Sequence, residues 1–433
     1  MMADVVTVRK GIYHDSVTLM RVSRALGELP GVEVAIVAMA TELNLGLAAD
    51  LGFELPDADP GDLLVALRGP DVGQARQELD RLLSERSSSV DSAGQPPLTT
   101  GSAARLGGDV VLVSVPGEYA FSEAVDAIEA GLPVMVFSDG MPVEQEIALK
   151  DLAARAGVLV MGPDCGTAVI AGAGLGFANV LRPGPVGVVA ASGTGAQQVT
   201  SLLDLAGVGV SHVLGVGGRD LSPEVGGRST AMALDLLDED PSTELIALIS
   251  KQHGVAVNPP MKPFIAKNQD LTAIAESILT TLGRSIPEWP SWPAWSGKSA
   301  TGVLHGVYSG GTLCLEAAAI TDMGDFVDYG DDAYTRGRPH PMIDPTLRLE
   351  ALARVNAGDV VLMDVVLGHG ADPDPAASLA HAVARCPATV VVALVGTEGD
   401  PQDLHRQATA FREAGAAVFT SNAQAARHAR SLL

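Results

Sequence analysis

The feature that most constrains the fold is a buried strand that passes into a helix through Ser and Gly, and it occurs twice. The copies are Val186-Gly-Val-Val-Ala-Ala-Ser192-Gly-Thr-Gly195 and Gly302-Val-Leu-His-Gly-Val-Tyr-Ser309-Gly-Gly-Thr312. A helix start carries unsatisfied N–H groups and about half a positive charge, and glycine lets an anion approach that backbone. We predict that the two helix ends face one anionic centre, a phosphate. The alternative is that Ser and Gly only cap each helix and form the turn.

The predicted phosphate-binding residues come from these two loops, with one arginine that could clamp an oxyanion in a bidentate manner. They are Ser192, Gly193, Thr194, Gly195, Ser309, Gly310, Gly311, Thr312 and Arg219. For Arg219 a structural ion pair with the neighbouring Asp220 or Glu224 is the competing interpretation.

Strands and helices alternate along the chain, which is typical of parallel sheets, and this pattern also covers the first strands at 4–8, 31–38 and 63–67. We predict an α/β protein of three consecutive Rossmann-like or flavodoxin-like parallel-sheet domains. The predicted bounds are 1–182 with a flexible Ser/Gly/Pro-rich loop at 86–105, then 183–285, a linker at 286–298, and 299–433. All three tryptophans lie in the linker, so we expect it to dock on a surface.

Open parallel sheets bind ligands beyond the carboxyl ends of their strands. The polar residues expected at such edges are Lys10, Glu118, Asp139 and Asp164. Turn formation beside Gly and Pro explains Asp139 and Asp164 equally well, and Lys10 can be a solvated lysine beside a capped helix. Cys165 is interpreted as a small buried residue rather than a nucleophile.

Four residues near predicted strand ends are candidates for catalysis: His340, Arg338, Asp344 and Glu398. Prolines on both sides restrict the backbone of His340, so it is the first candidate for general acid–base work or for contact with a phosphate. The competing interpretations are a histidine that stiffens a turn and, for Asp344, a helix N-cap followed by Pro345.

The chain is strongly acidic, with a net charge of −24 and a pI near 4.6. Such a surface repels nucleic acid and anionic membranes, so both are excluded as main partners. Three widely spaced cysteines without a CxxC pair predict a reduced, cytoplasmic protein without a zinc site. Charged residues interrupt the N-terminus and no run of 18 apolar residues occurs, so neither a signal peptide nor a membrane span is expected. We place no metal.

Specific motifs extend these inferences. Residues 108–250 resemble the alpha subunit of the succinyl-CoA synthetase superfamily, in runs such as Met161-Gly-Pro-Asp-Cys165 and Gly215-Val-Gly-Gly218, and residues 301–433 resemble the ligase-type domain of its partner subunit. The whole chain more closely resembles the FdrA family. The runs that carry this resemblance include Lys10-Gly-Ile-Tyr-His-Asp-Ser16, Ser114-Val-Pro-Gly-Glu-Tyr119, Gly337-Arg-Pro-His-Pro-Met-Ile-Asp-Pro345 and Gly396-Thr-Glu-Gly-Asp-Pro-Gln402.

The resemblance implies a function. In the superfamily, two helix ends point at a phosphate carried on a histidine. FdrA proteins are described as acyl-CoA synthetases, and the resemblance also implies a subunit of oxamate carbamoyltransferase, acting with two companion proteins. That reaction converts oxalurate and phosphate to oxamate and carbamoyl phosphate in purine (allantoin) breakdown. A hetero-oligomer is therefore expected, and a homodimer stays open.

The residues help to choose among these functions. Residues 9–16 are not a Gly-rich CoA loop, and the sequence encodes neither a nucleotide-grasp domain nor a Gly-His-Ala phosphohistidine loop. We therefore prefer carbamoyl transfer, with phosphate and carbamoyl phosphate as substrates, no certain cofactor and no CoA. The alternatives are a subunit similar to NDP-forming acyl-CoA synthetases and a non-catalytic scaffold. One departure from the family is the Pro-rich segment 251–268, which stands where a further helix and strand are expected.

Overall fold

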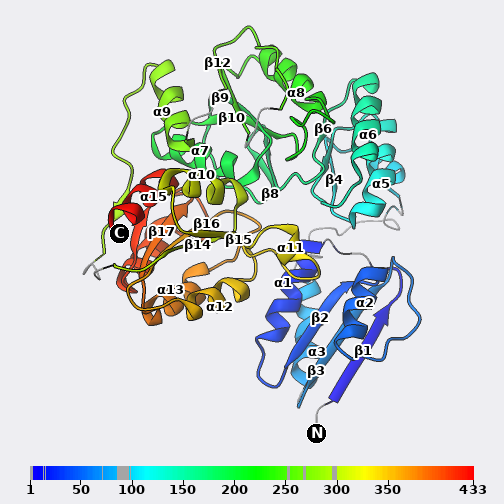
Figure 1. The fold of residues 1–433 in the computed structure, drawn as a ribbon. Helices are drawn as coiled ribbons and strands as arrows, with labels where there is room; N and C mark the ends of the chain where they lie inside the picture. Colours follow the sequence, from blue (N-terminus) through cyan, green and yellow to red (C-terminus); the bar gives the residue numbers. More distant parts are fainter. Residues whose placement is uncertain are drawn as a thin grey trace. The chain divides into compact units, whose positions relative to one another are not determined.

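The computed structural model describes residues 3–12, 14, 16–70, 72–84, 97, 99–250, 254–266, 270–294 and 300–433 (Figure 1). Contacts along the chain separate two compact units. The N-terminal unit comprises Met1–Pro97 with Thr335–Pro339, and the large unit comprises Leu98–Tyr334 with His340–Leu433.

The N-terminal unit is built on a three-stranded antiparallel sheet. Its elements are β1 (Ala3–Arg9), α1 (Ser16–Gly27), β2 (Val34–Met39), α2 (Glu42–Asp50), β3 (Leu63–Gly69) and α3 (Gly73–Ser84). β3 lies between β1 and β2 and runs antiparallel to both. The parallel pairing predicted for these three strands is therefore wrong. The connection through α1 makes β1 and β2 parallel to each other. Strand–helix alternation does not make them neighbours in the sheet, however, and β3 inserts between them.

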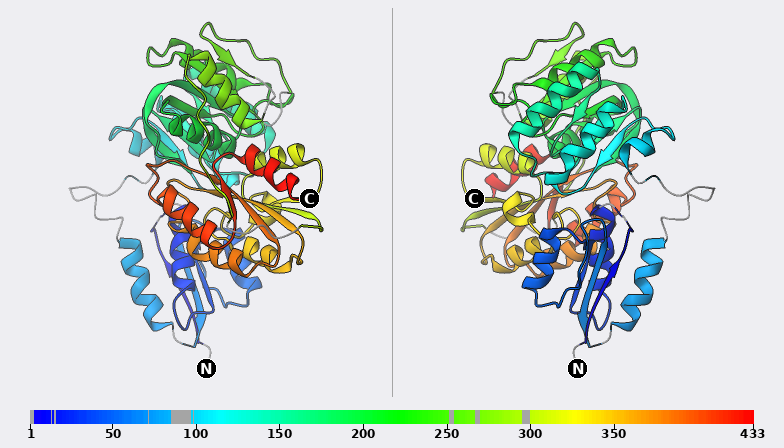
Figure 2. Two further views of the ribbon diagram at one scale, coloured as in Figure 1. Left: turned by 90° about the vertical axis from the view of Figure 1, so that its left-hand side faces the viewer. Right: turned by 90° about the vertical axis from the view of Figure 1, so that its right-hand side faces the viewer.

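Helices cover both faces of this sheet (Figure 2). Leu63 and Val65 of β3 pack in one cluster with residues of α1 and α3, whereas Leu64 and Ala66 pack in another with Ala48 of α2. Successive side chains of a strand point to opposite faces. Burial on both faces thus explains the unbroken apolar run of β3.

The large unit begins with a small parallel sheet of order β4-β5-β6. Its elements are α4 (Thr100–Ala104), β4 (Val111–Val113), α5 (Gly117–Glu129), β5 (Val134–Val136), α6 (Val143–Ala156) and β6 (Val160–Met161). The predicted flexible loop 86–105 is wrong at its C-terminal end, because Thr100–Ala104 form the helix α4. Thr99 and Ser102 form a capping box at the start of this helix. Residues 85–96 and 98 lie outside the described residues.

The second sheet of the large unit has six strands in the order β12-β11-β9-β10-β7-β8. Its elements are β7 (Thr167–Ile170), β8 (Ala173–Gly176), β9 (Pro183–Ala190), α7 (Gly193–Leu205), β10 (Val210–Gly215), α8 (Arg228–Glu239), β11 (Leu245–Ile249), β12 (Phe264–Ile265) and α9 (Leu271–Thr281). β9 to β12 pair in parallel, and the β7–β8 hairpin adds antiparallel to β10. The hairpin precedes residue 183, so this sheet crosses the predicted boundary at 182/183; the predicted domain bounds stay predictions.

The Pro-rich segment 251–268 is not only a loop. Phe264 and Ile265 form β12, which pairs in parallel with β11, and α9 follows. The expectation that only a loop stands in this place is thus corrected for its described part. Residues 251–253 and 267–269 lie outside the described residues.

The third sheet of the large unit also has six strands, in the order β13-β18-β17-β16-β14-β15. Its elements are β13 (Ser291–Trp292), β14 (Leu304–Tyr308), α10 (Gly311–Thr321), β15 (Asp325–Asp328), α11 (Asp332–Thr335), α12 (Thr346–Arg354), β16 (Val360–Val366), α13 (Pro375–Arg385), β17 (Thr389–Val395), α14 (Leu404–Glu413), β18 (Ala417–Phe419) and α15 (Asn422–Ser431). Strands β14 to β18 pair in parallel, and β13 adds antiparallel at the edge.

The tryptophan-containing linker docks on the large unit, as predicted. Trp289 is buried and donates a hydrogen bond from Nε1 to Glu276 of α9 at 3.1 Å. Trp292 pairs with Val418 and lies edge-on to the His405 ring. Trp295 lies outside the described residues.

The predicted α/β class with parallel sheets is confirmed for the large unit, where parallel strands dominate all three sheets. In the part of the chain that the structure describes, no helix combines the length and the apolar character that a membrane crossing requires.

Candidate functional site

The N-termini of α7 and α10 lie against each other. Ser192, the N-cap of α7, accepts a hydrogen bond from the Gly195 N–H at 3.0 Å. The same Ser192 Oγ lies 2.5 Å from Oγ1 of Thr312, in the first turn of α10, and the two hydroxyls share a hydrogen bond. Two loops far apart in the sequence are thus joined at one point, each at the positive end of a helix.

Glycine is needed where the two loops meet. A Cβ added to Gly310 would lie 2.7 Å from Cγ2 and 2.8 Å from Oγ1 of Thr194. A Cβ added to Gly195 would lie 2.8 Å from Ser192 Oγ and 3.2 Å from Cγ2 of Thr312. Side chains at these two positions would push the helix ends apart, so the glycines serve close approach.

Ser309 is held from behind by a buried aspartate. Asp364 Oδ1 on β16 accepts hydrogen bonds from the Ser309 N–H at 2.8 Å and from the Ser309 hydroxyl at 2.9 Å. Because its hydrogen is committed to Asp364, Ser309 fixes the loop instead of capping α10. The N-cap of α10 is Gly310, which has no side chain to cap the helix.

Asp364 forms a buried ion pair with Arg348 of α12. Arg348 Nη2 lies 3.3 Å from Asp364 Oδ1 and also donates to the Asp364 backbone carbonyl. Both side chains are almost inaccessible, at 2% and 0% exposure. Burial raises the pKa of Asp364, against the opposing effects of Arg348 and the Ser309 hydrogen bonds, and burial lowers the pKa of Arg348.

Sequence reasoning missed Asp364 and Arg348. A signal was present for the first, because Asp364 interrupts the apolar strand 360–366, and a carboxylate inside a fully buried strand needs a partner. Arg348 gave no signal, since an arginine in an amphipathic helix is normally solvated.

His340 lies beside the Ser309 loop. Its Nδ1 accepts a hydrogen bond from the Met342 N–H at 3.2 Å. A Cβ added to Gly330 would lie 2.8 Å from His340 Nε2 and 2.6 Å from the Ser309 carbonyl oxygen. Burial, and secondarily the charge of Arg348, lowers the pKa of His340 to about 4, so the ring is neutral near pH 7 and cannot serve there as a general acid in its protonated form.

Phe177 connects His340 to the Ser192 loop. The Phe177 ring centroid lies 5.4 Å from that of His340. The Phe177 carbonyl accepts a hydrogen bond from Thr167 Oγ1 at 2.8 Å, and a Cβ on Gly193 would lie 3.1 Å from that hydroxyl. His340 is therefore linked through packed groups to both helix ends.

Arg219 is engaged in an ion pair. Its Nη2 lies 3.0 Å from Glu146 Oε2 and donates to the Met141 carbonyl at 2.7 Å. Buried Lys150 joins the same group, since its Nζ lies 2.8 Å from both Glu146 and Asp220. This geometry fits the competing interpretation of Arg219 as a structural ion-pair residue, although its partner is Glu146 and not the expected Asp220 or Glu224. Its role as an anion clamp stays a prediction.

The other catalytic candidates are not brought to this place together. Asp344 Oδ1 accepts hydrogen bonds from the Thr346 N–H at 2.9 Å and from its hydroxyl. The N-cap of α12 is Pro345, however, so the predicted N-cap at Asp344 and the predicted first helical position at Pro345 each lie one residue too early. Glu398 is 67% exposed and lies 3.5 Å from His405. Arg338 is exposed and belongs to the N-terminal unit. Of the three predicted catalytic residues in the large unit, His340 is the one that lies beside the Ser309 loop.

The ligand-edge candidates of the large unit gather where the first two sheets meet. A Cβ on Gly117, next to the exposed Glu118, would lie 2.1 Å from the Asp139 carbonyl oxygen. Asp164 has a left-handed φ of 56° and follows the cis Gly162–Pro163 peptide bond. Its Oδ2 would lie 3.4 Å from a Cβ on Gly218.

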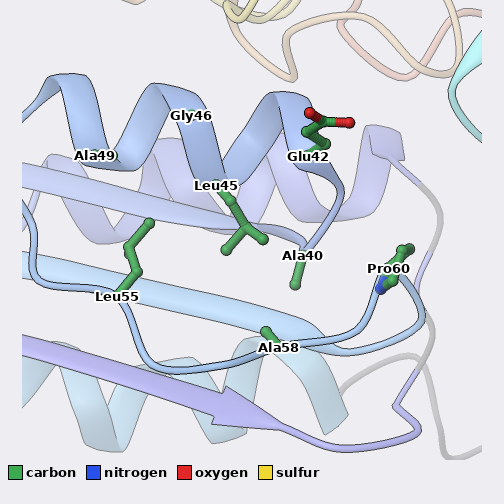
Figure 3. Close-up of a pocket in the computed structure, with 8 residues that line it drawn as sticks. All are labelled: Ala40, Glu42, Leu45, Gly46, Ala49, Leu55, Ala58 and Pro60. Atoms are coloured by element: carbon green, nitrogen blue, oxygen red, sulfur yellow. The ribbon is translucent and has the colours of Figure 1, made fainter.

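Lys10 belongs to the N-terminal unit, where it is exposed and helps to lower the pKa of Asp62, whose carboxylate is held mainly by the Asp59 N–H. The same unit has a pocket of about 480 Å³ between α2 and the segment that precedes β3, lined mainly by apolar groups such as Leu45, Leu55 and Ala58 (Figure 3). None of the predicted site residues lines it.

Cys165 is buried, as predicted. Burial raises the pKa of its thiol to about 12, so the nucleophilic thiolate is not populated at neutral pH.

Two family models match the chain. Residues 2–97 match the model described as AllF, heavy metal-associated domain, and residues 307–432 match the model described as CoA-ligase. A heavy-metal site does not fit residues 2–97. That segment contains no cysteine, soft metals favour thiolates, and the described residues hold no group of three His, Cys, Asp or Glu that could bind a metal ion.

Several curated proteins are similar. Uncharacterized protein YahF of Escherichia coli is 33% identical, over 99% of this chain and 98% of its own length. The alpha 2 subunit of an ADP-forming succinate–CoA ligase from Archaeoglobus fulgidus is 29% identical over 33% of this chain and 50% of its own length. SauD, a subunit of an ADP-forming sulfoacetate–CoA ligase from Bilophila wadsworthia, is 28% identical over 42% of this chain and 61% of its length.

The full-length similarity to YahF exceeds the partial similarity to the ligase subunits, of which the chain spans about half to three fifths. The CoA-ligase match covers α10 and His340, one side of the candidate site. The chain therefore belongs to the family of YahF, which is similar to the alpha subunit of succinyl-CoA synthetase.

Proposed function

We propose that this chain is the phosphate-handling subunit of a succinyl-CoA-synthetase-type enzyme and that the N-termini of α7 and α10 bind the phosphate of an acyl phosphate. The observation that carries the proposal is the hydrogen bond between Ser192 and Thr312, which brings two positive helix ends to one point. A single helix end binds anions weakly, whereas two that converge add their N–H donors and their dipoles.

The proposal fits the charge of the chain. At a net charge of −24, an anion is repelled from most of the surface. Backbone N–H groups supply local positive potential without lysine or arginine. Glycines at 193, 195, 310 and 311 let an oxyanion come close to these N–H groups.

The relatives support the reaction class that we propose. In an acyl-CoA ligase of this type, an acyl phosphate reacts with the CoA thiol; the carbonyl–oxygen bond to phosphate breaks, a thioester forms and phosphate leaves. The similar proteins are named as subunits of CoA ligases. We therefore propose that this chain also works in a hetero-oligomer, in which a partner supplies the remaining sites.

A second candidate is carbamoyl transfer of the FdrA type, in which oxalurate and phosphate give oxamate and carbamoyl phosphate. The observation that favours it is the N-terminal unit, where β1 runs antiparallel to β3 and the following loop is not Gly-rich. The resemblance to the synthetase implies a Gly-rich CoA loop after the first strand, and residues 9–16 are not one. Carbamoyl phosphate is itself an acyl phosphate, so both candidates use the same two helix ends.

Calorimetry and thermal shift of the whole chain test the proposal, with phosphate, acetyl phosphate, carbamoyl phosphate, CoA and ADP as ligands. A ligand that binds only the folded state raises its stability, by about 2.7 kcal/mol at 100 times Kd. Binding of phosphate together with CoA supports the ligase candidate, and binding of carbamoyl phosphate without CoA supports carbamoyl transfer.

Two variants separate a specific site from general anion effects. Thr312→Val removes the hydroxyl that joins α10 to Ser192. Loss of one neutral hydrogen bond costs about 0.5–1.5 kcal/mol, so phosphate affinity should fall about two- to tenfold. Ser122→Ala is the matched control, since the Ser122 hydroxyl is exposed and bonds only to the Tyr119 carbonyl. If phosphate and acyl phosphates all fail to bind the wild-type chain, the proposal is wrong and a scaffold role takes its place.

A further inference from the structure

The N-terminus of α15 meets both α7 and α10 (Figure 1). Its first residue, Asn422, is completely buried. The Asn422 N–H donates to Gln198 Oε1 of α7 at 2.9 Å, and Gln198 Nε2 donates to the Thr420 carbonyl at 3.0 Å. Both polar atoms of the Gln198 amide are thus paired with the backbone at the start of α15. These pairings fix the orientation of the amide and hold α15 to α7.

The Asn422 side chain makes the corresponding contacts with α10. Its Nδ2 donates to the Leu313 carbonyl in the first turn at 2.9 Å and to Glu316 Oε2 in the next turn at 2.6 Å. Its Oδ1 accepts from the Tyr308 hydroxyl at 3.0 Å, and Tyr308 directly precedes Ser309. Asn422 therefore contacts the chain on both sides of the turn that starts α10.

These bonds form a second connection between the two helices. The first connection is the Ser192–Thr312 hydrogen bond at their N-termini. Gln198 follows Ser192 by six residues, which is about 9 Å along the helix axis. Helices that are joined at two levels cannot tilt about a single contact. The network around Asn422 thus fixes both the distance and the direction between α7 and α10.

The amide groups of this network contribute more to order than to stability. A buried hydrogen bond adds little net stability, because the same groups bind water in the unfolded chain. Paired amides instead select one arrangement, since a shifted helix would leave N–H and carbonyl groups unpaired. Phosphate binding between two helix ends needs such an arrangement, because a hydrogen bond weakens steeply when its donor is displaced.

We infer that Gln198 and Asn422 are positioning residues, which hold the N-termini of α7 and α10 at the separation that one phosphate requires. The inference rests on the proposed function and goes beyond it, because it assigns part of the phosphate affinity to residues outside the two Ser-Gly loops. Neither residue belongs to those loops, so each acts through the helix that it holds.

The test measures phosphate affinity by calorimetry and stability by urea unfolding on the full chain. Gln198→Met removes both amide bonds at similar volume and should weaken phosphate binding about tenfold. Gln407→Met is the matched control. Gln407 is also fully buried, accepts from the Ala376 N–H at 2.9 Å and donates to the Gln402 carbonyl at 3.2 Å, but it joins α14 to α13. This control should lower the urea midpoint and leave phosphate affinity within about twofold.

Gln198→Glu is the conservative variant. A protonated carboxyl group keeps both bonds, because its carbonyl oxygen can accept from the Asn422 N–H and its hydroxyl can donate to the Thr420 carbonyl. A carboxylate instead places a negative oxygen against that carbonyl. Phosphate affinity should therefore be nearly normal at about pH 5 and reduced about tenfold at about pH 9. Each value is compared with the wild type at the same pH, because Glu316, which is bonded to Asn422, titrates as well.

The other outcomes overturn the inference or the proposed function separately. If Gln198→Met and Gln407→Met change phosphate affinity equally, the positioning role is wrong, whereas the proposed function stands. If Gln198→Met does not fold, Tyr308→Phe decides. It removes only the hydroxyl bonded to Asn422 and should weaken phosphate about threefold; an unchanged affinity would overturn the inference. If the wild-type chain binds neither phosphate nor acetyl phosphate, the proposed function itself fails, and the inference fails with it.

Discussion

Gly310→Ala tests whether the two helix ends touch as described. Gly310 has φ −129° and ψ 113°, an extended conformation that alanine adopts without strain. The cost of the substitution therefore comes from side-chain overlap alone. The added Cβ would lie 2.7 Å from Cγ2, 2.8 Å from Oγ1 and 2.9 Å from Cβ of Thr194, all inside normal contact distance.

The expected magnitudes follow from this overlap. Overpacking by one methyl group costs about 1–3 kcal/mol, so the free energy of unfolding should fall by that amount. The loop that carries Thr194 must also move away from α10. Loss of one hydrogen bond from a displaced N–H to phosphate costs about 1.5–3 kcal/mol, so phosphate affinity should fall about 10- to 100-fold.

The assay is a double-mutant cycle with Thr194→Gly, which removes all three overlapping atoms. Urea unfolding and phosphate calorimetry are measured for both single variants and for the pair. The pair should be more stable than the sum of the single effects predicts, by about 1 kcal/mol or more. Simple additivity would refute the contact between the loops. Gly101→Ala is the control, because a Cβ there meets nothing within 4 Å.

Two further predictions concern buried charges. Asp364→Asn leaves the Arg348 charge unpaired and should destabilise the chain by about 3–5 kcal/mol in urea unfolding. The control Glu350→Gln breaks an exposed pair with Arg354 and should cost less than about 1 kcal/mol. Equal losses of stability in the two variants would contradict the buried pair. Burial, against hydrogen bonds from Asn422 and Leu271, raises the pKa of Glu316 from 4.5 to about 7. Because the folded state keeps a proton that the unfolded chain releases, stability is complete below pH 4.5 and falls by about 3 kcal/mol as pH rises through 7. Glu316→Gln should remove this part of the pH dependence of urea midpoints, and an unchanged slope would show that another group causes it.

Much of the fold could be predicted because it depends on local patterns. The apolar strand 186–190 and the Ser-Gly turn after it have one physical interpretation, a buried strand that passes into a helix. The same holds for 304–308 and α10. The packing of the linker also followed from composition, since tryptophans rarely stay in water. The strand directions of the N-terminal unit could not be predicted from local patterns. There β3 lies between β1 and β2, two strands that precede it in the sequence.

The candidate site could be predicted only in part. Both loops were found because each carries its own signal, and the contact between Ser192 and Thr312 is their tertiary consequence. Asp344, Glu398 and Arg338 were grouped with His340 because all follow predicted strands. In the structure Asp344 binds the Thr346 N–H just before α12 and Glu398 faces solvent, since position after a strand does not fix where a side chain points.

The sequence by itself determined the alternation of strands and helices, the two positive helix ends and the acidic surface, because each depends on residues near one another in the chain. Only the tertiary structure decided that the two ends meet, that Asp364 and Arg348 hold Ser309, and that the Phe177 ring packs against His340. These depend on groups that are distant in the sequence, such as Ser309 and Asp364, 55 residues apart. No local pattern encodes such a pairing; it arises when the sheets pack.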